Sequence, residues 1–512
     1  MEIFSFVLYF VVVLAIGIYF FAKSKNEDEK DYFLGGRAMG PWVTAMSAQA
    51  SDMSGWLLMG LPASMLAVGF GQAWVGIGLA LGTAANWIFC AKRLRCFSKE
   101  SNDSITLPQY LSNRFLSKGK MLQVFCAVIF LVFFTFYVAS AFVAGTEVFT
   151  ALFGDLNVVA ALSIFSVIVI VYTFLGGFKA VCWTDFFQGL MMLIALLAVP
   201  IVIILSKDAV LNSSLLNNPI NGEVFVADFF DATPVDILSG LGWGLGYFGM
   251  PHILVRFMSI KKPSMIKKSA TVAIVWVILS LGAAILLAYL GRMLVVDGVN
   301  VGEELLISGK GTHIFISASR LLFPGIIAGF LLAAIIAASM STADSQLLVA
   351  SSSFTSDIYK PIIRKNASNK ETLWVGRIVV LIISVVAFFI ALSALLSESD
   401  SNPIMSLVDM AWAGFGGSFG PVVLLSLFWK RLTYKGACAG VLVGAVVDIV
   451  WMMAHKYAAE GSALYNVTSL YEIIPAFICG LLAAIVVSLI DKKPSQEVEQ
   501  LFDNAVAECK AK

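Results

Sequence analysis

The sequence predicts an all-α integral membrane protein with about thirteen spanning helices, and three observations lead to that prediction. First, 59% of the 512 residues are hydrophobic and only 13% are charged, against about a quarter charged in ordinary soluble proteins. Second, apolar runs long enough to cross a bilayer recur along the whole chain. Third, basic residues gather in alternate loops, as the positive-inside rule expects of a membrane protein.

The apolar runs define the expected spanning segments in chain order. A helix needs about 20 mostly apolar residues to cross the hydrocarbon core. Such runs lie near 3–22, 41–65, 71–91, 122–152, 157–177, 185–206, 233–255, 269–291, 323–352, 373–396, 403–429, 435–455 and 468–490. The first run lacks a preceding basic region and a small-residue cleavage site, so we expect it to remain as a spanning helix.

Lysine and arginine test this segmentation independently, because a miscounted helix would scramble their distribution. All but five of the 34 basic residues fall in alternate loops and the C-terminal tail. Lys25, Lys118 and Lys512 are among the residues that follow this pattern. The five exceptions are Lys207, Arg292, Lys310, Arg320 and Lys456. We therefore expect the N-terminus outside and the C-terminus in the cytoplasm. We expect one transmembrane domain over 1–491 and a short, charged cytoplasmic tail over 492–512, as a solvated helix or tail.

Composition also argues against several classes of protein. A net charge of +1, without a basic patch interleaved with aromatic residues, gives no sign of a nucleic-acid partner. The seven cysteines have neither metal-ligand nor disulfide spacing, so we expect free thiols. No cluster of His or Cys indicates an enzyme, and nothing in the sequence indicates an obligate protein partner.

A polar interruption lies in the second apolar run, where residues 47–56 read SAQASDMSGW. An ionisable residue such as Asp52 is costly inside a membrane and usually marks an ion or substrate path. The small residues around it, with Gly55 in the same turn, favour a locally broken helix. The backbone groups that such a break frees can hold an ion or a substrate.

A second interruption is expected in the seventh run, where alternating glycines from Gly240 to Gly249 precede Pro251. Each glycine weakens a helix by about 1 kcal/mol relative to alanine, and proline removes a backbone donor. The alternative is close helix packing through small residues. Two interruptions that each open a five-helix block fit an inverted repeat of helices 2–6 and 7–11.

The ninth run offers oxygen ligands for a small hard cation. On a helix, the hydroxyls of Ser341 and Thr342 lie over the turn that carries the Ala338 carbonyl. Broken-helix carbonyls at Ala50 and Met53 would complete an all-oxygen set, the chemistry that hard cations prefer. The alternative for such hydroxyls is a bond to their own helix backbone or to a neighbouring helix.

A second polar patch is expected on the same helix. Ser341, Asp344 and Ser345 share a face, and Asp185, near the start of helix six, can reach it. No Lys or Arg lies well inside any expected span. A substrate carboxylate would therefore be held by freed backbone amides or by a bound cation.

These residues resemble the sodium/solute symporter family, and within it the bacterial sodium/proline symporters. The likeness runs from about Tyr32 to Ile490 and is carried by LGGR (34–37), SDMSGWLLMGLP (51–62), GGFKAVCWTD (176–185), WGLGYFG (243–249), MST (340–342) and AWAGFGGSFGPVVL (411–424). The resemblance implies a LeuT-like inverted repeat with extra flanking helices. It also implies a secondary active transporter, not an enzyme, that carries L-proline into the cell with sodium by alternating access, in the plasma membrane of a bacterium.

The resemblance further implies roles for individual residues. It gives sodium ligands at Ala50, Met53, Ala338, Ser341 and Thr342. It gives sodium-coupling or supporting residues at Asp52, Ser54 and Gly55. Substrate-binding or gating residues match Ser51, Trp56, Tyr137, Trp243, Tyr247 and Pro251. A second sodium site of some relatives matches Asp185, Ser341, Asp344 and Ser345.

Two questions stay open at this level. Asp344 stands where relatives with a second sodium site usually have a small hydroxyl residue, which leaves the number of sodium ions open. The substrate is also open to alternatives, namely another amino acid, pantothenate or a sugar carried by the same fold. A membrane enzyme, a receptor domain or a channel is the more distant alternative.

Overall fold

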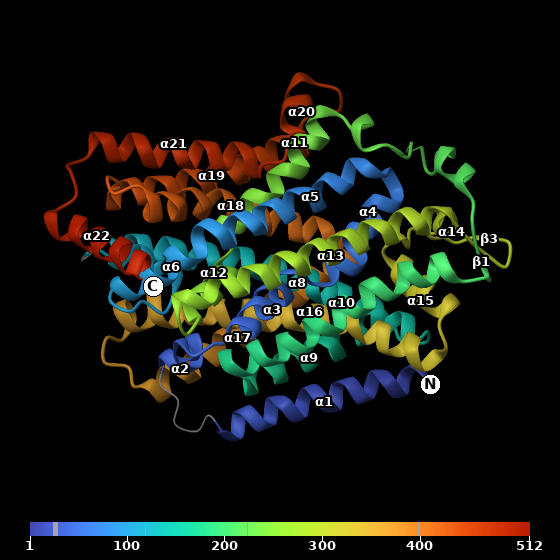
Figure 1. Ribbon diagram of the computed structural model, residues 1–512, viewed down its shortest axis with the longest axis horizontal. Coiled ribbons are helices and arrows are strands. Elements are labelled where there is room, and N and C mark those ends of the chain that lie inside the picture. Colours follow the sequence, from blue (N-terminus) through green and yellow to red (C-terminus); the bar gives the residue numbers. More distant parts are fainter. Residues whose placement is uncertain (24–28, 118, 223, 398–399, 512) are drawn as a thin grey trace.

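The computed structural model describes residues 1–23, 29–117, 119–222, 224–397 and 400–511, and most of them are helical. Lys25, Lys118 and Lys512, which the sequence assigns to the basic side, lie outside the described residues. Most helices run roughly along the long axis of the molecule, and the two chain ends lie at its opposite ends (Figure 1). The chain begins with α1 (Glu2–Lys23), α2 (Glu29–Leu34) and η1 (Gly35–Arg37).

The first half of the bundle follows. Its elements are α3 (Pro41–Asp52), η2 (Trp56–Gly60), α4 (Leu61–Val68), α5 (Phe70–Ala85), η3 (Asn86–Cys90), α6 (Ala91–Glu100), α7 (Leu107–Arg114), α8 (Met121–Leu152), α9 (Val158–Leu175) and α10 (Phe178–Leu205). A connecting segment then contains β1 (Ala209–Leu211), η4 (Ser213–Asn217) and η5 (Phe229–Asp231).

The second half begins at Pro234. It comprises α11 (Pro234–Gly242), η6 (Trp243–Phe248), α12 (Pro251–Ser259), η7 (Pro263–Met265), α13 (Ile266–Met293), β2 (Leu294–Val296), β3 (Val299–Asn300), α14 (Val301–Ile307), η8 (Gly311–His313), α15 (Ile314–Leu322), α16 (Gly325–Ser353), η9 (Phe354–Ile363), α17 (Asn369–Leu395) and α18 (Pro403–Phe428). The chain closes with α19 (Tyr434–Tyr457), α20 (Ala463–Thr468), α21 (Ile473–Ile490) and α22 (Gln496–Ala511).

Nine helices among the described residues are long and apolar enough to cross a membrane, and three shorter apolar helices accompany them. The predicted count of about thirteen spans stays a prediction, because interrupted segments are built from pairs of short helices. Large apolar side chains such as Leu8, Ile201 and Ile382 are exposed on the outer helix faces. Such a surface fits contact with lipid.

The first predicted interruption is confirmed. Helix α3 ends at Asp52, and Met53 leaves the helical region with φ −87° and ψ 85°. Helical geometry resumes at Gly55, which leads into η2 and then α4. A Cβ on Gly55 would overlap Ala144 of α8, so the break lies tightly against that helix.

The second predicted interruption is also confirmed. Helix α11 gives way to the tighter turns of η6, and Met250 has an extended backbone before Pro251 opens α12. The alternative interpretation of the glycine run, close packing, holds as well. A Cβ on Gly244 would meet the carbonyl of Gly78, and a Cβ on Gly82 would meet the backbone of Gly244. The glycines therefore serve both the break and the crossing of η6 with α5.

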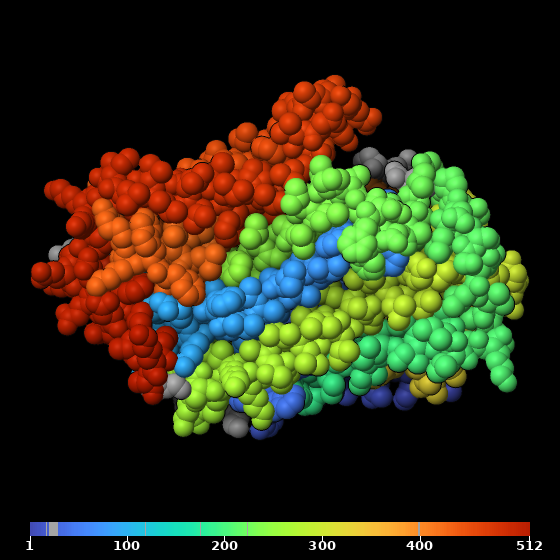
Figure 2. Space-filling view, turned by 45° about the horizontal axis from the view of Figure 1, so that its top comes forward, coloured from blue at the N-terminus to red at the C-terminus, as the bar shows by residue number. Residues whose placement is uncertain are grey.

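Helices distant in sequence lie side by side on the surface. In Figure 2, the light-blue band of α5 runs beside the yellow-green band of α13, and these two helices are in contact. Helix α16 packs in the middle of the bundle against α8, α10 and α1. A small antiparallel sheet of order β1-β2-β3 pairs Val210 with Val295 at the end that carries the N-terminus (Figure 1).

The C-terminal tail differs from the expectation of a solvated segment. Residues Val498, Phe502 and Ala505 of α22 are buried, and the Arg114 guanidinium lies 4.9 Å from the centre of the Phe502 ring. The Lys430 ammonium group pairs with Asp503 at 2.7 Å. The apolar stripe of this amphipathic helix needs burial, so the helix docks on α6 and α7 at the C-terminal end of the bundle.

The close crossing of α5 with η6 at their glycines predicts that a larger side chain there destabilises the fold. Gly82→Leu should lower the free energy of unfolding by about 1–3 kcal/mol, because the backbone of Gly244 must move to admit a side chain. Apparent Tm of the purified protein in detergent measures this. The matched control is Gly282→Leu in α13, where a Cβ meets nothing within 4 Å. Equal Tm values for both variants would contradict the close crossing.

Candidate functional site

The two interruptions meet at Asp52. Its carboxylate accepts a 2.6 Å hydrogen bond from the Tyr247 hydroxyl of η6. Its backbone carbonyl, freed where α3 ends, accepts bonds of 3.0 Å from the Trp56 indole and from the Tyr137 hydroxyl of α8. All four residues are buried. Asp52 thus ties both broken segments and α8 together at one point.

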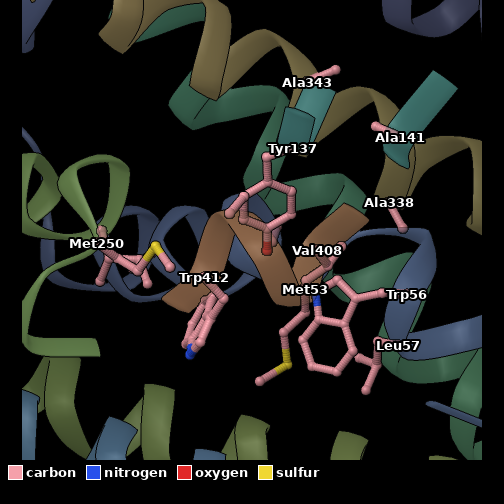
Figure 3. Packing of buried hydrophobic residues seen from close by; sticks show 14 of the residues in the cluster. Met53, Trp56, Leu57, Tyr137, Ala141, Met250, Ala338, Ala343, Val408 and Trp412 are labelled. Atoms are coloured by element: carbon pink, nitrogen blue, oxygen red, sulfur yellow. The ribbon is translucent and has the colours of Figure 1, made fainter. Parts of the chain in front are cut away.

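An aromatic group surrounds this point. Figure 3 shows Trp56, Tyr137 and Trp412 gathered near Met53, at the end of α3. The Trp412 indole of α18 donates to the Trp243 carbonyl at 2.8 Å. The rings of Tyr247 and Trp412 meet edge to face with centroids 5.0 Å apart. The rings present apolar faces with a few fixed polar groups, the usual character of a small-molecule site.

Oxygen atoms from two helices converge beside the first break. The Ser341 hydroxyl donates to the Ala50 carbonyl at 2.7 Å and to the Ala338 carbonyl at 3.0 Å. The Thr342 hydroxyl lies 3.4 Å from the same Ala50 carbonyl. Four of the five residues assigned as sodium ligands therefore meet between α3 and α16. The fifth, Met53, is the first non-helical residue after α3.

The remaining assigned residues occupy structural positions around the breaks. Ser51 donates to the Ala48 carbonyl at 3.1 Å, and the Ser54 hydroxyl accepts from the Trp56 amide at 3.4 Å. Gly55 packs against α8, and Pro251 is the first residue of α12. None of these contacts by itself places the residue against a ligand.

The second polar patch contains an arginine, which corrects one expectation. The sequence predicts no Lys or Arg well inside a span, yet Arg256 is 1% exposed in α12. Its guanidinium pairs with the Asp185 carboxylate at 3.2 Å and donates to the Ser345 hydroxyl at 2.5 Å. Helix α12 continues past the predicted end of the seventh run, near 255, to Ser259, so Arg256 lies on this helix and not in a loop.

Asp185 and Ser345 are thus brought together, with Arg256 between them. Ser341 instead faces the Ala50 carbonyl. Asp344 is fully buried, and both of its carboxylate oxygens lack a hydrogen-bond partner among the described residues. No group of three or more His, Cys, Asp or Glu that could hold a metal ion occurs in the described part of the chain.

Three residues of this region are absent from the sequence-based assignment. Arg256 looked like part of a basic loop. Ser47, which accepts from Arg256 Nε at 3.0 Å, belongs to the polar interruption at 47–56 but was given no role of its own. Trp412 lay within one of the family-like strings, and that string was the available signal. What identifies all three is a contact with another helix, which no local pattern contains.

A polar pocket of about 380 Å³ adjoins the aromatic group. Trp243 belongs to its lining, together with Asn402, Asp409, Tyr471 and Glu472. The Tyr471 and Trp243 rings stack with centroids 5.1 Å apart. The pocket therefore reaches the aromatic group through Trp243.

Comparisons with known proteins agree with this geometry. The model of the sodium:solute symporter family matches residues 32–444. The high-affinity proline transporter PutP of Bacillus subtilis is 44% identical over 494 residues, which cover 96% of this chain and 98% of that protein. The sodium/proline symporter of Escherichia coli is 41% identical over 511 residues, with 98% and 96% covered.

Solved structures match the fold. A Na⁺-coupled sialic acid symporter, in a substrate-bound outward-open state, has a TM-score of 0.73 at 20% identity, covering 97% of this chain and 99% of its own. MHP1, a nucleobase-cation-symport-1 family transporter, has a TM-score of 0.52 at 16% identity, covering 92% and 98%. The predicted LeuT-like inverted repeat, helices 2–6 against helices 7–11, is confirmed.

The bond between the two breaks predicts a stability effect. Tyr247→Phe should lower the free energy of unfolding by about 1–3 kcal/mol, because the buried Asp52 carboxylate loses its hydrogen-bond donor. Thermal unfolding in detergent measures the change. Tyr289→Phe is the control, since the Tyr289 ring packs on Phe70 and its hydroxyl makes no hydrogen bond among the described residues. A Tyr247→Phe protein as stable as the control would contradict the role of this bond.

Proposed function

Because the chain belongs to the sodium:solute symporter family, we propose that it is a secondary active transporter that carries L-proline into the cell together with sodium. The observation that carries the proposal is the meeting of Ala50, Ala338, Ser341 and Thr342 oxygens beside an aromatic group held by Asp52. The near full-length likeness to sodium/proline symporters supports the choice of ion and substrate.

Sodium would bind between α3 and α16. The Ser341 and Thr342 hydroxyls, which now donate to the Ala50 carbonyl, can rotate and present lone pairs to a cation. The Met53 carbonyl supplies a further oxygen at the end of α3. Binding of the ion would fix the end of α3 against α16 and so fix the break itself.

The break connects the ion to the substrate. Asp52 lies between the two, with its carboxylate on Tyr247 and its carbonyl on Trp56 and Tyr137. Ion binding that positions Asp52 also positions these rings. Such coupling is reciprocal, so proline must raise sodium affinity by the factor by which sodium raises proline affinity.

Proline fits the chemistry of the aromatic group around Asp52. Its ring and cationic amine suit the faces of Trp243, Tyr247 and Trp56, and its carboxylate suits freed backbone amides and bound sodium. Arg256 is not available for the carboxylate, because Asp185, Ser345, Ser47 and the His252 carbonyl already engage its guanidinium. Ser51 and Pro251 then act at the margins of the pocket, one at each break.

We place the protein in the plasma membrane of a bacterium, with the N-terminus outside and the C-terminus in the cytoplasm. The chain ends lie at opposite ends of the bundle (Figure 1). The end that carries α22 also carries Lys99, Arg114 and Lys430, as expected for the cytoplasmic side. We assign residues 1–491 to the transporter domain and 492–512 to the tail, of which α22 (Gln496–Ala511) docks on α6 and α7.

The proposal predicts sodium-driven uptake. Purified protein in proteoliposomes should accumulate labelled L-proline when an inward sodium gradient is imposed, and potassium in place of sodium should abolish accumulation. Excess unlabelled proline should compete, whereas pantothenate, sugars and other amino acids should not. Uptake without any need for sodium would contradict the coupling. Stronger competition by another solute would change the substrate and leave the coupling intact.

The ion site predicts a selective loss of sodium affinity. Ser341→Ala should weaken sodium affinity by roughly 10- to 100-fold, because one oxygen that bonds the ion is removed. The sodium concentration for half-maximal proline uptake measures this. Ser339→Ala on the same helix is the control, since its hydroxyl bonds the Ile335 carbonyl of its own helix at 3.0 Å. Equal sodium dependence in both variants would refute the assignment of Ser341.

A further inference from the structure

Helix α22 brings two cysteines from distant parts of the chain together at the C-terminal end of the bundle, where it lies beside α6 (Figure 1). The Cys509 thiol of α22 donates a hydrogen bond to the Lys92 carbonyl of α6 at 3.7 Å. On a helix, the side chain of Cys96 leans toward the turn that contains Lys92, four residues back. The Cys96 thiol in turn donates a hydrogen bond to the Cys509 sulfur. Both residues are free cysteines.

Contacts that do not involve sulfur hold the two helices in this register. The rings of Phe97 and Phe502 meet edge to face with centroids 5.2 Å apart. The Lys99 ammonium group pairs with the Glu508 carboxylate at 3.1 Å. The two thiols are therefore neighbours because apolar packing and an ion pair align α22 with α6.

The two thiols have different surroundings. Cys96 is fully buried, whereas Cys509 is half-buried. The hydrogen bond from Cys96 lowers the pKa of the Cys509 thiol, and so do the positive charges of Arg93 and Lys92, against the opposing effects of burial and of Glu508. The thiolate is the form that reacts with oxidants, and redox-active cysteines are typically accessible, of low pKa and next to a second cysteine. Cys509 therefore suits the attacking role, and Cys96 suits the role of the second cysteine.

We propose that Cys96 and Cys509 form a reversible disulfide in response to hydrogen peroxide, and that this disulfide fixes α22 covalently to α6. The Cys509 thiolate attacks one oxygen of the peroxide, the O–O bond breaks, and the departing hydroxide takes up a proton and becomes water. Cys509 is then a sulfenic acid. The Cys96 sulfur attacks the sulfenic sulfur, the S–O bond breaks, and hydroxide leaves as water with the Cys96 proton. The two thiols lose two electrons in total, and one peroxide is reduced to two water molecules.

Such a disulfide suits the proposed cytoplasmic placement of α22. Thiols in that compartment are normally kept reduced, and the disulfides that do form there in mesophiles are mostly transient and redox-sensing. The docking of α22 through its apolar stripe is non-covalent in the reduced protein. Oxidation makes the attachment covalent until another thiol reduces it. The inference goes beyond the proposed function and does not depend on the substrate.

The wild-type protein gives the first test. Purified full-length protein in detergent is treated with hydrogen peroxide, the remaining thiols are blocked with iodoacetamide, and unreduced peptides are analysed by mass spectrometry. We expect the peptide of Cys96 joined to that of Cys509, and the thiol count in denaturant should fall by two from seven. Dithiothreitol before blocking should reverse both changes. Two intact thiols after peroxide, or Cys509 joined to any other cysteine, overturns the inference.

Cysteine variants separate the two roles. In Cys96→Ser the oxidation of Cys509 should stop at the sulfenic acid, which dimedone labels, whereas the wild-type protein should resist this label. Cys509→Ser should leave the buried Cys96 reduced. Cys479→Ser is the matched control, because Cys479 is half-buried like Cys509 but lies in α21, and the disulfide should form as in the wild-type protein. Equal dimedone labelling of Cys509 with and without Cys96 overturns the inference.

The attachment of the tail is measured directly. Lys492 is exposed between α21 and α22, and residues 496–509 contain no Lys or Arg, so limited trypsin cleavage at Lys492 leaves that helix intact. On a denaturing gel without reductant, the cleaved tail should stay joined to the rest of a peroxide-treated protein and separate from an untreated one. Separation in both samples overturns the covalent attachment. The wild-type measurements decide the question even where a cysteine variant does not fold.

Discussion

The hydrogen bond between Asp52 and Tyr247 is the interaction on which the rest of this structure depends. Backbone groups inside a membrane must find partners within the protein, because lipid offers none. A broken helix therefore needs side chains that bond its freed backbone groups, as Trp56 and Tyr137 bond the Asp52 carbonyl. The Asp52 carboxylate accepts a hydrogen bond from Tyr247 at the second break. Its backbone carbonyl, at the first break, accepts hydrogen bonds from Trp56 and Tyr137.

Small residues make that arrangement possible. Gly78 and Gly82 of α5 allow the backbone of Gly244 to approach closely, and Gly249 lies against the backbone of α18. Larger side chains at these positions would push η6 away from its neighbours and separate Tyr247 from Asp52. The glycines thus lower helix stability locally and permit the close packing that holds the break in place.

Helix α16 links the two polar regions of the bundle. Its Ser341 and Thr342 face the Ala50 carbonyl, and Ser345, one turn further on, faces Arg256. A movement of this helix relative to α3 would change both regions together. Hydrogen bonds to a backbone carbonyl of α3 at one region and to the Arg256 guanidinium at the other give the same helix two different kinds of attachment.

The sequence by itself determined the features that depend on local patterns. Apolar runs, basic loops and the glycine and serine interruptions identified the membrane class, the repeat and both breaks, because hydrophobic length and helix weakness are properties of neighbouring residues. The sequence also predicted that the Ala50 carbonyl and the Ser341 hydroxyl lie together, because the first break and the ninth run were taken as two parts of one cation site.

Only the tertiary structure decided what lies against what. The sequence placed Arg256 in a basic loop, whereas α12 carries it into a cluster with Asp185 and Ser345, and the tail expected in solvent docks through Phe502. A charge is tolerated in a protein interior when distant segments supply its partners. Apart from the His252 carbonyl of its own helix, these partners come from three helices far apart in the chain, α3, α10 and α16. No stretch of sequence around Arg256 therefore contains the information that it is buried.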